Sequence, residues 1–214
     1  MIKLVIADDH AIVREGIKRI FSLTDDLQVM GEAANGAEVM QHVRSTVFDV
    51  LILDLSMPGR TGIELIKLVH CEKPRLRILV LSMHEELQYA VRAIKSGASG
   101  YLAKDSAPSQ LIHVVRKIAG GGAFISADVA EQLATGAVPG TPVAAHEKLS
   151  DREFEVFRSI ADGISVTDIA RRLSLSAKTI STHKANLMHK MGFHNQSELI
   201  RYAIRMGVTE PLEP

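Results

Sequence analysis

A run of four apolar residues that ends in an aspartate constrains the fold of this chain more than any other feature. Residues 50–53 read Val-Leu-Ile-Leu, and Asp54 follows at once. A short run that is apolar at every position predicts a strand buried on both faces, as in parallel sheets. Because parallel strands are joined by crossover helices, short strands and amphipathic helices should alternate around this run.

The first 120 residues show this alternation. Three further short apolar runs stand at residues 4–7, 78–81 and 101–103, and residues 29–33 give a weaker candidate strand. Stretches with apolar residues at helical spacing follow the runs, and they cover residues 12–21, 37–45, 63–70, 87–95 and 108–118. We therefore predict an α/β domain with a parallel five-stranded sheet in residues 1–120.

A segment poor in charge follows this domain. Residues 120–122 are all glycine, and residues 135–145 contain further glycines and prolines. Such a composition buries little surface, which is typical of a flexible linker. We predict a linker at residues 121–148, in which a short helix can form around residues 127–134.

From residue 149 onward the apolar spacing is helical throughout. Ser150 and Glu153 have the spacing of a capping box, which predicts a helix start. A short helix at 166–173, a three-residue turn and a longer polar helix at 177–190 give a helix-turn-helix pattern. A last helix is expected at 197–205. Residues 149–214 are thus predicted to form an all-α helix-turn-helix domain.

The distribution of charge favours an anion-binding face in this second domain. The chain as a whole has 25 basic and 25 acidic residues, so its net charge does not indicate a nucleic-acid partner. No acidic residue, however, stands between Asp168 and Glu198, a window that contains three lysines and two arginines. A local surplus of positive charge suits a phosphate backbone. A solvated helix face that is basic by chance is the open alternative.

Polar residues follow the predicted strands of the first domain. Asp8 and Asp9, Asp54, Ser82 and Lys104 each stand at the carboxyl end of a strand. In an open parallel sheet these ends meet at one edge, where ligands bind. Three carboxylates there repel one another, and Mg²⁺ relieves that repulsion. A carboxylate beside Mg²⁺ can attack phosphorus, and a lysine can pair with the phosphate. Taken singly, each residue also suits a helix cap, a turn or the surface.

Residues 1–120 resemble a response-regulator receiver domain. The matching segments are Asp8-Asp9 and residues 53–59, 81–83 and 97–105. The resemblance implies a flavodoxin-like fold in which Asp54 accepts a phosphoryl group from a sensor histidine kinase. It also implies that Asp9, Asp54 and the Ser56 main-chain carbonyl bind Mg²⁺, with Asp8 acting mainly through water. Ser82 and Tyr101 match the switch positions of the family, and Lys104 matches the lysine that pairs with the phosphate. Packing of Tyr101 on the sheet is the alternative for that residue.

Residues 149–192 resemble a LuxR-type output domain, with matching segments at 149–157, 160–163, 168–173, 178–183 and 190–192. With the receiver, the whole chain resembles a NarL/FixJ-class response regulator. The resemblance implies a homodimer, when phosphorylated, on double-stranded DNA. It places at base-facing positions Ser181, Thr182 and Ala185, and at or near the DNA backbone Lys178, Thr179, His183, Lys184 and Lys190. Because Ser181 and Ala185 are short, DNA shape is expected to add selectivity. A structural bundle helix remains the alternative.

The function predicted from these features is phosphorylation-controlled regulation of transcription, not enzymatic turnover of a separate substrate. A Mg²⁺-dependent phosphatase-like enzyme is one alternative, although Ser56 stands where such an enzyme needs a second aspartate. A receiver-based protein-interaction module without DNA binding is the other. No apolar run approaches the ~20 residues that span a bilayer, and Cys71 is the only cysteine. We therefore expect a cytoplasmic protein with no membrane partner.

Overall fold

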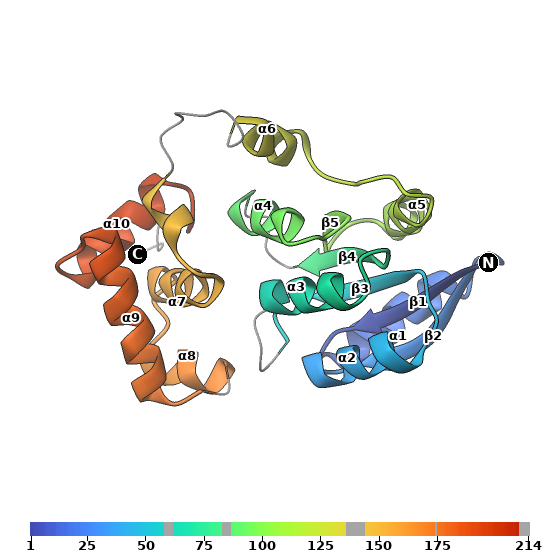
Figure 1. The fold of residues 1–214 in the computed structure, drawn as a ribbon, viewed down its shortest axis with the longest axis horizontal. Helices are drawn as coiled ribbons and strands as arrows, with labels where there is room; N and C mark the ends of the chain where they lie inside the picture. Colours follow the sequence, from blue (N-terminus) through green and yellow to red (C-terminus); the bar gives the residue numbers. More distant parts are fainter. Residues whose placement is uncertain (58–61, 83–86, 136–143, 174, 210–214) are drawn as a thin grey trace. The chain divides into compact units, whose positions relative to one another are not determined.

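The computed structural model describes residues 1–57, 62–82, 87–135, 144–173 and 175–209 (Figure 1). The chain divides into two compact units, Met1–Leu133 and Ala134–Pro214. Within the described ranges, no helix is both long enough and apolar enough to cross a membrane.

The first unit is built on a five-stranded sheet in the order β2-β1-β3-β4-β5. The strands are β1 (Ile2–Ala7), β2 (Leu27–Ala33), β3 (Val50–Asp54), β4 (Arg77–Ser82) and β5 (Gly100–Ala103). All neighbouring strands pair in parallel, so the predicted parallel α/β sheet is confirmed. Every residue of β3 is buried, as its uninterrupted apolar run requires.

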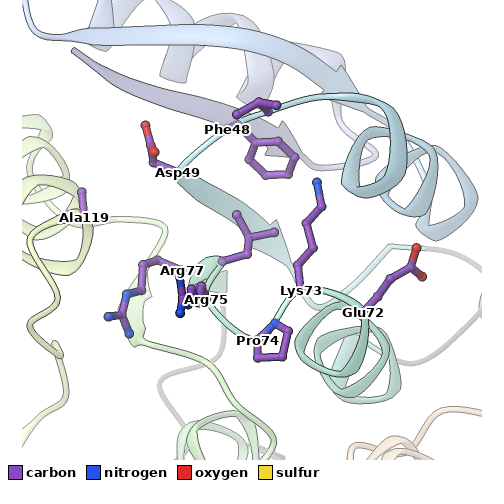
Figure 2. A pocket seen from close by; sticks show the side chains of 10 residues that line it. Phe48, Asp49, Glu72, Lys73, Pro74, Arg75, Arg77 and Ala119 are labelled. Atoms are coloured by element: carbon purple, nitrogen blue, oxygen red, sulfur yellow. The ribbon is translucent and has the colours of Figure 1, made fainter.

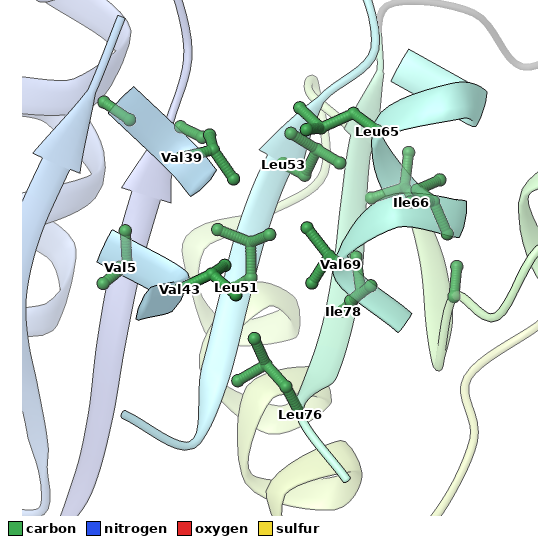
Figure 3. Close-up of a cluster of buried hydrophobic side chains, with 14 of the residues drawn as sticks. Val5, Val39, Val43, Leu51, Leu53, Leu65, Ile66, Val69, Leu76 and Ile78 are labelled. Atoms are coloured by element: carbon green, nitrogen blue, oxygen red, sulfur yellow. The ribbon is translucent and has the colours of Figure 1, made fainter. Parts of the chain in front are cut away.

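Helices cover both faces of the sheet. Leu51 and Leu53 pack on one face against α2 (Gly36–Ser45), α3 (Gly62–Glu72) and α4 (Leu87–Lys95), in the cluster drawn in Figure 3. Val50 and Ile52 pack on the other face against α1 (Ala11–Phe21) and α5 (Pro108–Ala119). Burying one such aliphatic side chain stabilises a fold by about 1.5–3 kcal/mol. The central strand thus anchors both halves of the core and fixes the position of Asp54 at its end.

The structure differs from the predicted linker over residues 121–133. Phe124 continues the sheet edge, because the Tyr101 N–H donates to its carbonyl oxygen at 3.0 Å. In α6 (Ala127–Thr135), Val129 is buried against Ala90 and Val91 of α4. Phe124 and Val129 attach residues 121–133 to the first unit. The prediction missed them because it rested on the average composition of a glycine-rich segment. Residues 136–143 of the predicted linker lie outside the described residues.

The second unit is helical, as predicted. Its elements are the 3₁₀ helix η1 (Ala145–Lys148) and the α-helices α7 (Asp151–Ala161), α8 (Val166–Arg172), α9 (Ala177–Met191) and α10 (Gln196–Arg205). Helix α9 packs on α7 and α8, and α10 packs on α7. Ser150 and Glu153 form the predicted capping box. The α8–α9 pair forms the predicted helix-turn-helix, although Ser174 of its turn lies outside the described residues.

The end of the predicted linker also belongs to this helical unit. His146 of η1 is fully buried, and its ring stacks on Phe157 with an interplanar angle of 8°. Its Nδ1 atom lies 2.9 Å from the Tyr202 hydroxyl. His146 therefore connects η1 to α7 and α10. Of the stretch predicted as a linker, the start belongs to the first unit and the end belongs to the helical unit.

Candidate functional site

Two aspartates meet at the edge of the sheet where the strand order changes direction. Strand β1 lies between β2 and β3, so the connection from β1 to β2 runs to one side of β1, and the connection from β2 to β3 runs back to the other side. Asp8 directly follows β1, and Asp54 ends β3 one residue beyond the paired residues Ala7 and Leu53. Ligands of open α/β sheets bind at such a switch point, beyond the carboxyl ends of the strands.

Lys104 joins these two aspartates. Its ammonium nitrogen lies 2.8 Å from Asp54 Oδ2 and 2.7 Å from Asp8 Oδ2. Both carboxylates are almost wholly inaccessible, with 2% of Asp8 and 1% of Asp54 exposed. Burial acts to lower the pKa of Lys104, but its hydrogen bonds to the two aspartates outweigh burial and raise it. Lys104 therefore remains a cation beside the buried pair.

The surroundings of Asp54 disfavour an uncompensated negative charge. Burial raises the pKa of the Asp54 carboxyl group, although Lys104 and the Ser56 N–H act to lower it. The Ser56 N–H donates to Asp54 Oδ1 at 3.1 Å. Gly62, at the start of α3, lies close behind this turn, since a Cβ atom there would stand 2.6 Å from the Cα atom of Leu55. The close approach of α3 leaves Leu55, the residue that follows Asp54, packed directly against the start of that helix.

Asp9 and one residue that sequence reasoning missed complete the cluster. Potential ligand atoms of Asp8, Asp9, His10 and Asp54 all lie within 4.8 Å of one another. His10 directly follows the two aspartates in the sequence, and this position could have indicated a role at the site. The spacing of apolar residues in the helix, however, does not predict where the His10 ring points. The structure thus brings together three predicted carboxylates, the predicted lysine and an additional imidazole.

This donor set fits a divalent cation. Three carboxylates and one ammonium leave two formal negative charges at the site when His10 is neutral, which is the charge that one Mg²⁺ ion neutralises. Carboxylate oxygens are the protein ligands that Mg²⁺ prefers. This acidic cluster therefore has the chemistry of a magnesium site.

The remaining predicted residues of this site lie around the same edge. Ser82 ends β4 and is fully buried, and its carbonyl oxygen accepts the Lys104 N–H at 2.9 Å. Tyr101 of β5 is partly buried and packs against the clusters that contain Val80 and Val129. In this structure Tyr101 packs on the sheet, as the alternative for this residue expects. Any switch movement of Tyr101 would start from this packed position.

Arg14 is a second residue that the sequence did not single out. Its guanidinium group donates to the main-chain oxygen of Asp8 at 2.7 Å and to Glu32 Oε2 at 3.0 Å. Lys18 also binds Glu32, at 2.6 Å, and is the first cause of the lowered pKa of Glu32. These bonds tie α1 to β2 and hold the loop that carries Asp8.

A cavity of about 730 Å³ lies at the opposite edge of the sheet (Figure 2). It is lined mainly by residues that precede β3 and β4, including Phe48, Lys73 and Arg75, and by Arg77, the first residue of β4. It contains none of the residues predicted for the acidic site. This cavity is therefore separate from the acidic cluster, which lies at the carboxyl ends of the strands.

In the second unit, α9 has the cap and the exposed face that a DNA-reading helix needs. The Ser176 hydroxyl oxygen accepts the Thr179 N–H at 3.0 Å and so caps the helix. Gly192 ends the helix with a φ of 68°, a left-handed conformation that favours glycine. Ile180 and Leu187 are buried. The opposite side of the helix is exposed at Lys178, Ser181, Thr182, Ala185 and Asn186.

The three positions predicted to face the bases have short side chains, and two of them hydrogen-bond within the helix itself. The Ser181 hydroxyl donates to the Ala177 carbonyl oxygen at 2.9 Å, and the Thr182 hydroxyl donates to the Lys178 carbonyl oxygen at 3.0 Å. Hydroxyls used in this way keep acceptor lone pairs for an outside donor. With the methyl group of Ala185, this face offers acceptors and apolar contacts.

Two lysines predicted near the DNA backbone have partners within the helical unit. Lys184 Nζ donates to Gln196 Oε1 at 2.7 Å, and Lys190 Nζ lies 2.7 Å from Glu153 Oε2. Burial acts to raise the pKa of Glu153, but hydrogen bonds from Lys190 and Ser150 outweigh it and lower that pKa. Lys190 thus compensates an almost buried carboxylate, a structural role that sequence spacing did not reveal.

Comparisons with known proteins agree with this two-part architecture. Residues 4–116 match the model of the response regulator receiver domain, and residues 147–203 match that of the bacterial regulatory proteins of the luxR family. The response regulator UvrY of Escherichia coli (strain K12) is 32% identical over 209 residues, which cover 97% of this chain and 96% of UvrY. The oxygen regulatory protein NreC of Staphylococcus carnosus (strain TM300) is 36% identical over 210 residues, 95% of this chain and 97% of NreC.

Solved structures give the same result. RcsB from Salmonella enterica serovar Typhimurium, bound to promoter rprA in the presence of the phosphomimetic BeF₃⁻, matches with a TM-score of 0.65 and 32% identity, over 94% of this chain and 98% of that one. A structure of two RcsB dimers bound to two parallel DNAs matches with a TM-score of 0.58 and 32% identity, over 94% and 96%. Sequence, fold and both family models thus agree over nearly the whole chain. The chain belongs to the NarL/FixJ-class response regulators of two-component systems, which join a receiver domain to a LuxR-type DNA-binding domain.

Proposed function

We propose that Asp54 accepts a phosphoryl group from a phosphohistidine of a sensor histidine kinase, and that this charge controls DNA binding by α9. One observation carries the first half. Asp54 is buried at the sheet's switch point, beside Asp8 and within 2.8 Å of the Lys104 ammonium. A nucleophile, a phosphate-pairing cation and a metal-binding acid pair then occupy one edge. We assign the receiver role to residues 1–120, with the Phe124 and α6 extension, and the DNA-binding role to residues 149–214.

The transfer uses one oxygen of the Asp54 carboxylate. This oxygen attacks phosphorus, the bond between phosphorus and the histidine nitrogen breaks, and the imidazole leaves with the electron pair and takes up a proton. The product on Asp54 is an acyl phosphate. Lys104 pairs with a phosphoryl oxygen as a point charge. We assign Mg²⁺ to Asp9, Asp54 and the Ser56 main-chain carbonyl, with Asp8 acting through water; when bound, it neutralises and orients the phosphoryl group.

The phosphoryl group is proposed to act on the rest of the receiver through Ser82 and Tyr101. A hydroxyl donor such as Ser82 can follow a phosphoryl oxygen, and Tyr101 can move inward in response. Tyr101 packs at present on the cluster that contains Val129 and Leu133 of α6. Its displacement would therefore loosen the contact of α6 with the sheet unit. Helix α6 directly precedes the segment that leads to the DNA-binding unit.

The second half of the proposal concerns α9 and double-stranded DNA. The RcsB complexes support it, because those related chains were solved on promoter DNA and as dimers. In this chain, Ser181, Thr182 and Ala185 are proposed to face the bases. The proposed contacts to the backbone, or close to it, come from Lys178, Thr179, His183, Lys184 and Lys190. Dimerisation after phosphorylation would pair two such helices on adjacent half-sites. We expect this function in the cytoplasm, where bacterial DNA is found.

The role of Lys184 provides a test of the DNA-binding half. Replacing Lys184 by alanine should weaken binding to every duplex, because a contact to phosphate does not depend on sequence. The slope of log affinity against log salt is negative, and its magnitude should decrease by about one. Titrations of unrelated duplexes at several salt concentrations, followed by fluorescence anisotropy, measure both quantities.

Arg19→Ala is the matched control, since Arg19 is an exposed cation of α1 in the first unit. It removes the same charge and should leave the salt slope unchanged. A loss confined to one DNA sequence would place Lys184 on a base edge instead. An unchanged slope would remove Lys184 from the interface, leaving its bond to Gln196 as its role.

A further inference from the structure

His10 stands at the open side of the acidic cluster. Its side chain is 62% exposed, whereas that of Asp9 is 31% exposed and that of Asp8 only 2%. Its Nδ1 atom lies 2.9 Å from Asp9 Oδ1 and 3.3 Å from Asp8 Oδ1. The imidazole is therefore close enough to the carboxylates to share a bound cation with them.

The backbone explains why the ring turns toward the carboxylates. His10 is the N-cap residue of α1, with extended backbone angles of −89° and 108°, and its side chain makes no capping bond. Its N–H donates to Asp8 Oδ1 at 2.8 Å, which draws residues 8–10 into a tight turn. The His10 ring makes no hydrogen bond to the start of α1 and instead faces the carboxylates of Asp8 and Asp9.

We propose that His10 is an additional metal ligand, and that it raises the preference of this site for the borderline cations Co²⁺, Ni²⁺ and Zn²⁺ over Mg²⁺. The inference rests on the proposed assignment of Mg²⁺ to the same acids. Ligand atoms of Asp8, Asp9, His10 and Asp54 within 4.8 Å of one another form a mixed set of oxygen and nitrogen donors.

Coordination chemistry separates the two classes of cation. Mg²⁺ prefers oxygen ligands and keeps several waters, so an imidazole adds little to its binding. Imidazole nitrogen is a good ligand for Zn²⁺, Ni²⁺ and related first-row ions. These ions bind nitrogen ligands much more tightly than hard cations such as Mg²⁺ do. His10 should therefore raise the affinity for Co²⁺ much more than the affinity for Mg²⁺. Both classes would compete for the same carboxylates.

A direct test measures two affinities in the full-length protein. Co²⁺ is titrated into wild type and His10→Ala and followed by its visible absorption, and Mg²⁺ is titrated by calorimetry. The ratio of Co²⁺ affinity to Mg²⁺ affinity should fall at least about tenfold in His10→Ala, because even the loss of a residue that only supports a metal ligand typically costs about 10–100-fold in affinity. Ring-nitrogen NMR shifts of His10 should change much more with Zn²⁺ than with Mg²⁺, because only Zn²⁺ binds the ring itself.

His113→Ala is the matched control, because His113 is an exposed histidine of α5 that lies on a different element. It should keep the wild-type ratio. An equal fall in both variants would mean general binding to surface histidines, and an unchanged ratio in His10→Ala would exclude His10 as a ligand; either result overturns the inference. Labelling of Asp54 by acetyl phosphate with Mg²⁺ tests the proposed function separately. Normal labelling with an unchanged ratio would refute only the role of His10.

Discussion

Replacing Asp54 by asparagine should reduce labelling by acetyl phosphate and Mg²⁺ by at least about 100-fold, because the nucleophilic oxygen becomes a neutral amide oxygen. Asparagine has nearly the same shape and can still accept the Ser56 N–H that Asp54 accepts at 3.1 Å. Since burial raises the pKa of Asp54, a neutral side chain there also avoids the cost of a buried charge. The variant should therefore fold, and its loss of labelling should be chemical.

Intact-protein mass spectrometry measures this labelling as the gain of one phosphoryl group. Asp25→Asn serves as the control, because Asp25 is an exposed carboxylate in the loop before β2. It should label like the wild type. If Asp54→Asn labels as fast as the wild type, another residue accepts the phosphoryl group, and the buried Lys104–Asp54 pair is only structural.

Replacing Ala185 by glutamate should reduce the affinity for every duplex by at least about tenfold. Ala185 is exposed on α9, in a window without acidic residues between Asp168 and Glu198. A carboxylate there would face base edges and phosphates and meet like charge on close approach. Glutamate is a good helix former, so α9 should remain intact. Fluorescence anisotropy with a promoter duplex measures the loss.

Ser197→Glu adds the same charge outside α9 and is the control. Ser197 is exposed in the first turn of α10, where an acidic residue favours the helix. This variant should bind DNA with nearly the wild-type affinity. Wild-type affinity in Ala185→Glu would instead show that DNA contacts a surface other than this face of α9.

The sequence predicted the sheet and its functional edge because strong local patterns determine both. The uninterrupted run before Asp54 can be satisfied only by a strand buried on both faces, and β3 is buried throughout. The position of Lys104 beside Asp8 and Asp54 then follows from the rule that parallel strands end at a common edge.

Other features depend on contacts that no local pattern encodes. Phe124 and Val129 attach residues 121–133 to the first unit, but they stand singly in a glycine-rich stretch whose average composition is typical of a linker. The pairing of Lys190 with Glu153 joins residues far apart in sequence. The direction of the His10 ring depends on backbone angles at a helix start. Tertiary packing, more than residue type, determines these three outcomes.

Coupling between Asp54 and α9 is the central claim, and one measurement tests it most directly. The affinity of the full-length protein for a promoter duplex is measured by fluorescence anisotropy, with and without acetyl phosphate and Mg²⁺, for wild type and Asp54→Asn. We expect the phosphodonor to increase the affinity of the wild type at least about fivefold, the scale of an ordinary coupling free energy, and to leave Asp54→Asn unchanged. Equal affinities of phosphorylated and unphosphorylated wild type, or an equal increase in Asp54→Asn, would contradict control of DNA binding through Asp54.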